Sequence, residues 1–127
     1  MKIEHIAIWT KDIERSRNFH KTFFNAKSGD KYKNSEKGFS SYFLNFDNGC
    51  RLEIMNKKND IKNIVGERFF GISHFAMSVG TKQIVDELTE TLRKDGFNVV
   101  SSPRETGDGY YESVVLDPDG NRIELTI

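Results

Sequence analysis

The chain carries the same pattern of residues twice, and this repeat constrains the fold more than any other feature. Asn48–Met55 (NGCRLEIM) and Asp119–Thr126 (DGNRIELT) both read turn residue, glycine, any residue, arginine, aliphatic, glutamate. Further upstream, His5 and His74 each stand two residues before an alanine. An internal repeat indicates that one structural unit is present twice. We therefore expect two equivalent modules, each with one histidine near its start and one glutamate near its end.

The length of the chain sets how these modules are organised. At 127 residues the chain has the size of one ordinary domain and is long enough to bury a core. We predict one domain over residues 1–127, made of two repeats at residues 1–55 and 71–127. Residues 56–70 are largely polar at their start and show no hydrophobic pattern, so they are predicted to form the linker.

Within each copy, an alternating strand is followed by a helix and then by three short strands. Asp12 is expected to cap the first helix, which ends near Asn25, and Thr81 caps the second, which ends at Gly96. The expected strands lie at residues 3–10, 27–32, 39–46 and 51–55 in the first copy, and at 72–79, 98–101, 111–116 and 122–127 in the second. The pattern predicts an α+β fold of two tandem βαβββ modules.

Strand alternation separates the glutamates from the apolar core. Glu53 and Glu124 are flanked by aliphatic residues that point to the opposite face, where the helix must pack. His74 likewise shares its face with the small residues Ala76 and Ser78. Two such sheets facing each other would form an open, cup-shaped mixed β-barrel with the helices outside. Both histidines and both glutamates would then point into the cup.

Carboxylates turned into a cup need partners, because an unpaired buried charge costs several kcal/mol. A divalent metal is a suitable partner for two carboxylates and two imidazoles, and leaves open positions for water or substrate. The predicted metal ligands are His5, Glu53, His74 and Glu124. The alternative is that two ordinary Arg–Glu pairs lie on a solvated sheet face, next to two unrelated histidines.

The third histidine and the only cysteine are predicted to be structural. His20 lies in the apolar stripe of the first helix, between Phe19 and Phe23, and is expected to keep its polar edge at the surface. Cys50 excludes an intrachain disulfide and a cysteine-rich zinc site, since it has no second cysteine to join. It is interpreted as a small buried hydrophobic residue.

Charge and hydropathy exclude two classes of partner. Lysine plus arginine and aspartate plus glutamate both number 19, and no basic run suggests nucleic-acid binding. No apolar run approaches the roughly 18 residues of a membrane span, and the N-terminus has no signal segment. We therefore expect a soluble, cytoplasmic protein that binds neither nucleic acid nor membrane.

Four stretches of the chain together resemble the vicinal oxygen chelate superfamily, which includes glyoxalase I, fosfomycin-resistance proteins, extradiol dioxygenases and bleomycin-binding proteins. They are the two histidine motifs at His5–Ile8 and His74–Met77, the helix segment Arg15–His20, and the closing Asp117–Glu124. The resemblance covers nearly the whole chain and implies paired βαβββ modules around a metal. It also implies a homodimer.

The presence of Glu53 resembles bacterial glyoxalase I (lactoylglutathione lyase) in particular, where a carboxylate stands at this position in addition to His, His and Glu. The resemblance implies one divalent metal per site, either nickel, cobalt, zinc or manganese. It also implies a lyase or isomerase that acts on a small hemithioacetal, or a related substrate with vicinal oxygens, through a metal-stabilised enediolate. One metal-bound glutamate would be the catalytic base; Glu124 is preferred by position and Glu53 is the other candidate.

The sequence leaves two alternatives open. One is a thiol transferase or a ring-cleaving dioxygenase of the same superfamily, and the other is a non-catalytic protein that binds a small aromatic molecule or antibiotic. For the latter, the cup would be lined by Trp9, Phe43, Phe46 and Tyr111. The glycine-rich segment Pro103–Tyr111 is expected to be a loop that closes over a substrate. Candidate substrate-binding residues are Arg104, Tyr110, Tyr111 and Trp9, and for the first three a plain surface or core role is the alternative.

Overall fold

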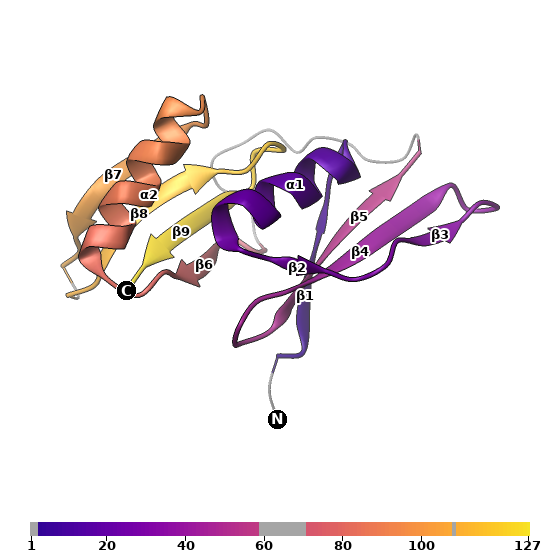
Figure 1. Cartoon of the computed structure of the whole chain (residues 1–127), viewed down its shortest axis with the longest axis horizontal. Helices are drawn as coiled ribbons and strands as arrows, with labels where there is room; N and C mark the ends of the chain where they lie inside the picture. Colours follow the sequence, from indigo (N-terminus) through magenta and orange to yellow (C-terminus); the bar gives the residue numbers. More distant parts are fainter. Residues whose placement is uncertain (1–2, 59–70, 108) are drawn as a thin grey trace. The chain divides into compact units, whose positions relative to one another are not determined.

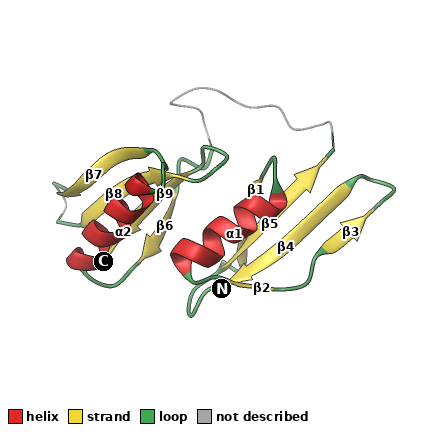
Figure 2. Cartoon of the chain, turned by 45° about the horizontal axis from the view of Figure 1, so that its top comes forward, coloured by secondary structure: helices red, strands yellow, loops and turns green. Residues whose placement is uncertain are grey.

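A computed structural model describes residues 3–58, 71–107 and 109–127 of the chain. The chain divides into two compact units, residues 1–65 and 66–127 (Figures 1 and 2). Both units contain one helix laid across one face of a β-sheet, as the repeat predicts.

The first unit is built from one helix and a sheet that has a parallel strand pair at one edge. Its elements are β1 (His5–Trp9), α1 (Ile13–Phe24), β2 (Lys27–Ser28), β3 (Tyr32–Asn34), β4 (Phe39–Asn45) and β5 (Arg51–Lys57). The strand order is β1-β5-β4-β2, with β3 also paired to β4. β1 runs parallel to β5, and the remaining pairs are antiparallel. β5 continues to Lys57, two residues beyond the end expected for the first repeat.

The single strand predicted at residues 27–32 is divided in two. Ser28 pairs with Leu44 and Tyr32 pairs with Ser41, so the β2–β3 side spans one residue more than the β4 side. One extra residue on one side of an antiparallel pair is the definition of a bulge, and it interrupts the hydrogen-bond ladder. The first unit therefore has two short strands where the second has one.

Local capping explains where α1 begins and ends. The Asp12 carboxylate accepts hydrogen bonds from the backbone N–H groups of Glu14 and Arg15, and Asn25 ends the helix in the left-handed conformation (φ 53°). The Asp12 cap and the end of the helix near Asn25 agree with the sequence prediction. The buried face of the helix consists of Ile13, Ser16, Phe19 and His20. It lies on the sheet face that carries the fully buried Leu44 and Ile54.

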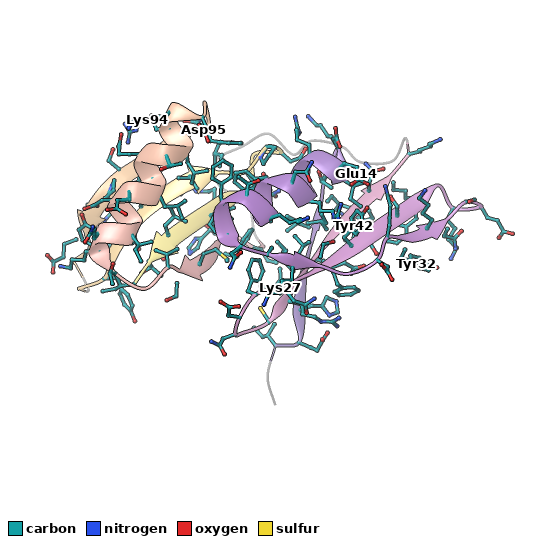
Figure 3. All side chains as sticks on the ribbon, in the orientation of Figure 1. Glu14, Lys27, Tyr32, Tyr42, Lys94 and Asp95 are labelled. Carbon is teal, nitrogen blue, oxygen red and sulfur yellow. The ribbon has the colours of Figure 1, made fainter. Side chains whose placement is uncertain are left out.

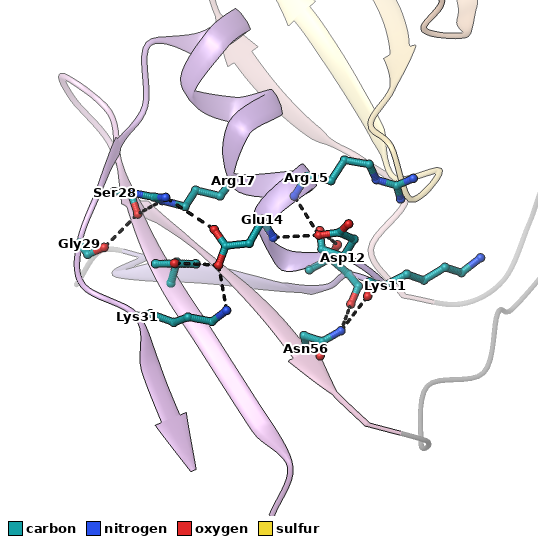
Figure 4. Close-up of polar contacts among 11 residues, drawn as sticks. Lys11, Asp12, Glu14, Arg15, Arg17, Ser28, Gly29, Lys31 and Asn56 are labelled. Carbon is teal, nitrogen blue, oxygen red and sulfur yellow. Dashed lines mark hydrogen bonds and ion pairs between the residues drawn. The ribbon is translucent and has the colours of Figure 1, made fainter. Parts of the chain in front are cut away.

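A polar network at the edge of α1 also ties the helix to the sheet (Figures 3 and 4). The Glu14 carboxylate accepts hydrogen bonds from Lys31 Nζ (2.8 Å) and from the Tyr42 hydroxyl (3.0 Å). Arg17 Nε donates to Ser28 Oγ (3.0 Å), and its guanidinium lies 4.8 Å from the centre of the Tyr42 ring. Tyr42 is buried, so this network marks the helix-covered face of β4.

The second unit has the predicted βαβββ order. Its elements are β6 (Phe75–Ser78), α2 (Lys82–Lys94), β7 (Val99–Glu105), β8 (Tyr111–Leu116) and β9 (Arg122–Thr126). The strand order is β6-β9-β8-β7, with β6 parallel to β9, and this repeats the arrangement of β1, β5 and β4. The parallel register also repeats, because Ala7 pairs with Glu53 and Ala76 pairs with Glu124.

α2 follows the predicted limits and packs on the sheet through a face that carries both apolar and polar residues. The Thr81 hydroxyl accepts from the Ile84 N–H, and Gly96, with φ 87°, follows the last turn. Val85, Thr89 and Leu92 are buried. The Thr89 hydroxyl meets the Ser113 hydroxyl of β8 at 2.7 Å, so a polar contact crosses this core. No helix in the described ranges is long and apolar enough to cross a membrane.

The turn between β8 and β9 is organised around Asp117, which is only 4% exposed. Its carboxylate accepts from the backbone N–H groups of Asp119 (2.9 Å) and Asn121 (2.8 Å), and from Asn121 Nδ2 (2.8 Å). We predict that Asp117→Ala lowers the free energy of unfolding by about 2 kcal/mol, because it leaves these donors without their acceptor. Urea unfolding at pH 7 measures the change.

Asp47 provides the matched control for this prediction. It lies in the corresponding turn of the first unit, but it is exposed and its side chain contacts Lys27 at 3.7 Å. Asp47→Ala should therefore change the unfolding free energy by less than about 0.5 kcal/mol. Equal effects of the two substitutions would show that the buried hydrogen bonds of Asp117 do not stabilise the turn.

Candidate metal centre

In the first unit, His5 and Glu53 are brought together by the parallel pair β1–β5. Leu52 and Ile54 are buried under α1, so Glu53 points to the opposite face of the sheet. His5 opens β1, two residues from Ala7, the register partner of Glu53. The separation of His5 Nε2 from Glu53 Oε2 is 3.9 Å. The face opposite the helix therefore carries an imidazole and a carboxylate side by side.

The second unit repeats this pair. Glu124 lies between the buried Ile123 and Leu125 on β9, and His74 precedes β6. His74 Nε2 lies 3.4 Å from Glu124 Oε2. The side-chain exposures also match: 40% for His5 and 44% for His74, against 16% for Glu53 and 19% for Glu124. Each unit thus places one of the predicted ligand histidines next to one of the predicted ligand glutamates.

The donor atoms in each pair suit a shared metal ion. Two donors that each lie about 2.1 Å from one ion are roughly 3.0 to 3.4 Å apart. The observed separations of 3.9 and 3.4 Å are close to this range. Among the residues that the structure describes, no group of three or more His, Cys, Asp or Glu side chains is arranged to hold a metal. Each unit thus supplies two candidate ligands, one imidazole and one carboxylate.

The surroundings of the two glutamates differ. Glu53 is in register with Phe43, whereas Glu124 is in register with Val114. Burial, followed by the negative charge of nearby Glu112, raises the pKa of the Glu124 carboxyl. Glu112 in turn accepts a hydrogen bond from Arg104 Nη2 (3.1 Å). The second pair therefore has a further carboxylate and a guanidinium beside it.

Glu112 was not among the residues predicted from the sequence. Its neighbour Ser113 is buried against α2, so alternation along β8 turns Glu112 to the face of Glu124. The signal is weak in the sequence, because Tyr111–Leu116 contains no clear alternation of polar and apolar residues. The structure thus adds one acidic residue to the neighbourhood of the second pair.

The sequence also matches a known family. The sequence model of the Glyoxalase/Bleomycin resistance protein/Dioxygenase superfamily matches residues 2–125 of the chain. The chain belongs to this superfamily. This confirms the resemblance that the two histidine motifs and the closing motif indicate.

Individual proteins of known sequence or structure are also similar over nearly the full chain. The uncharacterized protein YqjT of Bacillus subtilis (strain 168) is 28% identical over 126 residues, which cover 97% of this chain and 96% of that protein. A glyoxylase/bleomycin resistance protein/dioxygenase domain from Frankia sp. EAN1pec superimposes with a TM-score of 0.85 at 16% identity, covering 100% and 97% of the two chains. Glyoxalase I from Zea mays superimposes with a TM-score of 0.81 at 22% identity, covering 98% of this chain. The chain spans 44% of the length of the maize enzyme. These superpositions show that the α+β fold is the glyoxalase-like fold.

Two of the four predicted substrate-binding residues of this glyoxalase-superfamily chain lie on the faces that carry the His–Glu pairs. Trp9 shares its strand face with His5 and Ala7, and its ring meets Phe39 at 6.2 Å. Arg104 contacts Glu112 and donates to Ser101 Oγ (3.2 Å). Both remain candidates for substrate contact.

The two tyrosines are placed differently. The Tyr111 hydroxyl donates to Asp86 on α2 (2.7 Å), so this side chain lies on the helix-covered side and not with Glu124. The hydrogen bond to Asp86 and partial burial also raise the pKa of Tyr111. Tyr110 is exposed in the turn, where its backbone pairs with Thr106. The structure therefore does not place Tyr111 on the His–Glu face.

The expected loop at residues 103–111 is also shorter than predicted. β7 continues through Pro103 to Glu105, and Arg104 pairs in register with Glu112. The turn is closed by Thr106, whose N–H donates to the Tyr110 carbonyl (2.8 Å). Residues 103–105 are therefore part of β7 rather than of a loop, and Asp108 lies outside the described residues.

The prediction that His20 keeps a polar edge at the surface is wrong. The residue is fully buried, and the centre of its ring lies 5.2 Å from that of Phe19 and 5.8 Å from that of Phe24. Burial lowers its pKa to about 4, so the ring is neutral at pH 7. Its structural role in the helix core agrees with the interpretation from the sequence. Cys50, by contrast, is half-buried rather than buried.

Proposed function

We propose that the chain is a divalent-metal-dependent lyase or isomerase of the glyoxalase type, acting on a small hemithioacetal or a related substrate with vicinal oxygens. His5, Glu53, His74 and Glu124 would together bind one nickel, cobalt, zinc or manganese ion. The observation that carries the proposal is the repeated His–Glu pair, with donor separations of 3.9 and 3.4 Å at equivalent strand positions. Two neutral imidazoles and two carboxylates are a suitable ligand set for such ions.

The chemistry divides between the ion and the residues of the chain. A bound metal would polarise the substrate oxygens and stabilise the negative charge that develops when a proton leaves carbon. Glu124 would accept this proton and return it to the adjacent carbon. The neighbouring carboxylate of Glu112 supports this choice, since a like charge beside Glu124 favours its protonated form. Glu53, which faces Phe43 in register, is the other candidate.

Two residues are proposed to contact the substrate. The Arg104 guanidinium would attract an anionic group, since it lies on the face of Glu112 and is 53% exposed. Trp9 is 43% exposed, and its ring, on the His5 face, would cover an apolar part of the substrate. Neither residue is assigned a step in proton transfer.

Metal content provides the direct test. We expect about one ion per His2Glu2 set after dialysis, measured by elemental mass spectrometry, and loss of this ion in Glu53→Gln and Glu124→Gln. Glu36→Gln, an exposed change in the turn before β4, is the control and should retain the metal. The proposal fails if the wild-type protein takes up no nickel, cobalt, zinc or manganese, even when each is added back.

The reaction is tested with the metal-loaded protein. Hemithioacetals prepared from methylglyoxal with glutathione, cysteine or N-acetylcysteine are suitable probes, and we expect thioester formation with at least one of them. Oxygen consumption with catechols and modification of fosfomycin should be absent. Activity in either of these assays would instead assign the chain to the dioxygenases or thiol transferases of the superfamily.

The exposed Trp9 ring favours one second candidate, a non-catalytic protein that binds a small aromatic molecule. Such a protein would be stabilised against thermal unfolding by its ligand without turnover. Stabilisation by an aromatic antibiotic such as bleomycin that persists after metal is removed with EDTA would support this candidate. Stabilisation that requires the metal would support the enzyme.

We also propose that the protein is a homodimer with two sites. Sedimentation velocity should then give twice the chain mass of 14.6 kDa. Mixing Glu53→Gln with Glu124→Gln shows how the sites are assembled. If each site combines residues of two chains, re-equilibrated mixtures should recover about a quarter of the wild-type metal sites, because one site of each mixed dimer is intact. No recovery would place all four ligands within one chain.

A further inference from the structure

We propose that Glu4, held by Arg51, is a positioning residue that fixes the ring orientation and the tautomer of His5. This inference rests on the proposed metal site. It further assigns unequal roles to the two units, with His5 held more firmly than His74. The residues that the two repeats share do not explain this difference, which comes from the residue before each histidine: Glu4 in the first repeat and Ser73 in the second.

The Glu4 carboxylate uses its two oxygens for different partners. Oε2 lies 2.6 Å from His5 Nδ1, while Oε1 accepts from Arg51 Nε at 2.7 Å and also pairs with Arg51 Nη2. The backbone reinforces the contact, because the Arg51 N–H donates to the Glu4 carbonyl (3.0 Å). Glu4 is therefore fixed by β5 even though its side chain is 56% exposed.

Aromatic contacts complete the support of His5. The Arg51 guanidinium lies 4.1 Å from the centre of the Phe43 ring, where the negative face of the ring favours a cation. His5 itself meets Phe43 edge-on, with centroids 5.3 Å apart and an interplanar angle of 89°. Glu4, Arg51, Phe43 and His5 thus form a closed ring of contacts. Rotation of the imidazole would break its contact with Glu4 or with Phe43.

The arrangement selects the imidazole tautomer that a metal requires. A carboxylate can only accept, so the hydrogen bond at Nδ1 places the proton on this nitrogen. Nε2 then has a free lone pair, and this is the nitrogen that faces Glu53. Carboxylate–histidine pairs of this kind fix the orientation of the imidazole and make it a stronger ligand for a metal.

His74 lacks an equivalent carboxylate at the preceding position. Its Nδ1 lies 3.4 Å from the Ser73 hydroxyl, which is a longer contact to a neutral group that either donates or accepts. A hydroxyl therefore neither fixes the tautomer nor adds negative charge. The two histidines that look equivalent in the sequence are supported by chemically different neighbours.

The test compares Glu4→Ala with Ser73→Ala in the full chain. We expect Glu4→Ala to weaken zinc binding 10- to 100-fold, measured by calorimetric titration, and Ser73→Ala to weaken it less than about threefold. Glu4→Gln retains an acceptor oxygen and should restore part of the affinity. Equal thermal midpoints of the metal-free variants would show that the fold is unchanged.

A second readout does not depend on the metal. Two-bond hydrogen–nitrogen correlation spectra of the metal-free protein report the tautomer of each histidine. In the wild type we expect the Nδ1–H form for His5, and loss of this preference in Glu4→Ala with the His74 signals unchanged. An unaltered His5 tautomer together with unaltered zinc affinity in Glu4→Ala would overturn the inference. A wild type that binds no metal but shows the Glu4-dependent tautomer would overturn the proposed function while leaving the positioning role of Glu4 intact.

Discussion

Glu124→Gln is expected to lower kcat for hemithioacetal isomerisation by about 10²- to 10⁴-fold, the usual contribution of a general base. Glutamine is nearly isosteric with glutamate and still offers a carbonyl oxygen to a metal, but it cannot take up the proton. The mostly buried position of Glu124 and its neighbour Glu112 make proton uptake at this carboxyl favourable in the wild type. The measurement is steady-state kinetics at a metal concentration that saturates the variant.

Glu53→Gln is the control, because it removes the same charge from the equivalent strand position of the other unit. If Glu53 is only a metal ligand, Glu53→Gln should need a higher metal concentration for saturation. Once saturated with metal, its kcat should be within about tenfold of the wild-type value. A larger decrease of kcat in metal-saturated Glu53→Gln than in metal-saturated Glu124→Gln would identify Glu53 as the base. Full turnover of metal-saturated Glu124→Gln would exclude Glu124 as the base.

The sequence predicts the repeat, the helices and the strand face of both glutamates because these depend on local and periodic signals. Asp12 and Thr81 cap their helices as expected, since a side-chain oxygen before a helix satisfies backbone N–H groups whatever the tertiary context. The face of Glu53 and Glu124 follows from period-two alternation with buried aliphatic neighbours. These features require no knowledge of which strands pair.

Strand limits and edge contacts could not be predicted, because partner strands determine them. The bulge between Ser28 and Tyr32 depends on the register with β4, and the extension of β7 to Glu105 depends on pairing with β8. Glycines after residue 105 suggested a longer loop, but pairing continues up to the turn. A partner strand thus overrides the local composition.

The contacts of Glu4 and Tyr111 illustrate the same limit for side chains. Tyr111 was expected in the cup, but polar and apolar residues do not alternate clearly along Tyr111–Leu116. The sequence therefore does not reveal which face of this strand the helix covers. The contact with Asp86 on α2 shows that Tyr111 lies on the helix-covered side. Glu4 is far from Arg51 in the sequence, and their ion pair exists because β1 and β5 are parallel neighbours.

Acid is expected to destabilise the protein through His20, beginning near pH 6.5. The folded-state pKa of His20 is lowered from 6.5 to about 4 by burial, so the unfolded chain binds a proton first as the pH falls. Stability linked to this residue is therefore complete above pH 6.5 and is lost progressively down to about pH 4. A difference of this size corresponds to about 3 kcal/mol in the free energy of unfolding. Urea unfolding at a series of pH values between 7.5 and 4.5 measures the loss.

His20→Phe isolates this contribution, because phenylalanine fills a similar volume among Phe19 and Phe24 and does not titrate. The variant should lose less stability than the wild type between pH 7 and 5, whatever its stability at pH 7. Carboxylates such as Glu14, whose pKa is lowered mainly by the hydrogen bond from Lys31, destabilise both proteins alike at lower pH. The difference between the two pH profiles therefore reports His20 alone. Parallel profiles would show that the buried imidazole is not the group that acid must protonate to unfold this protein.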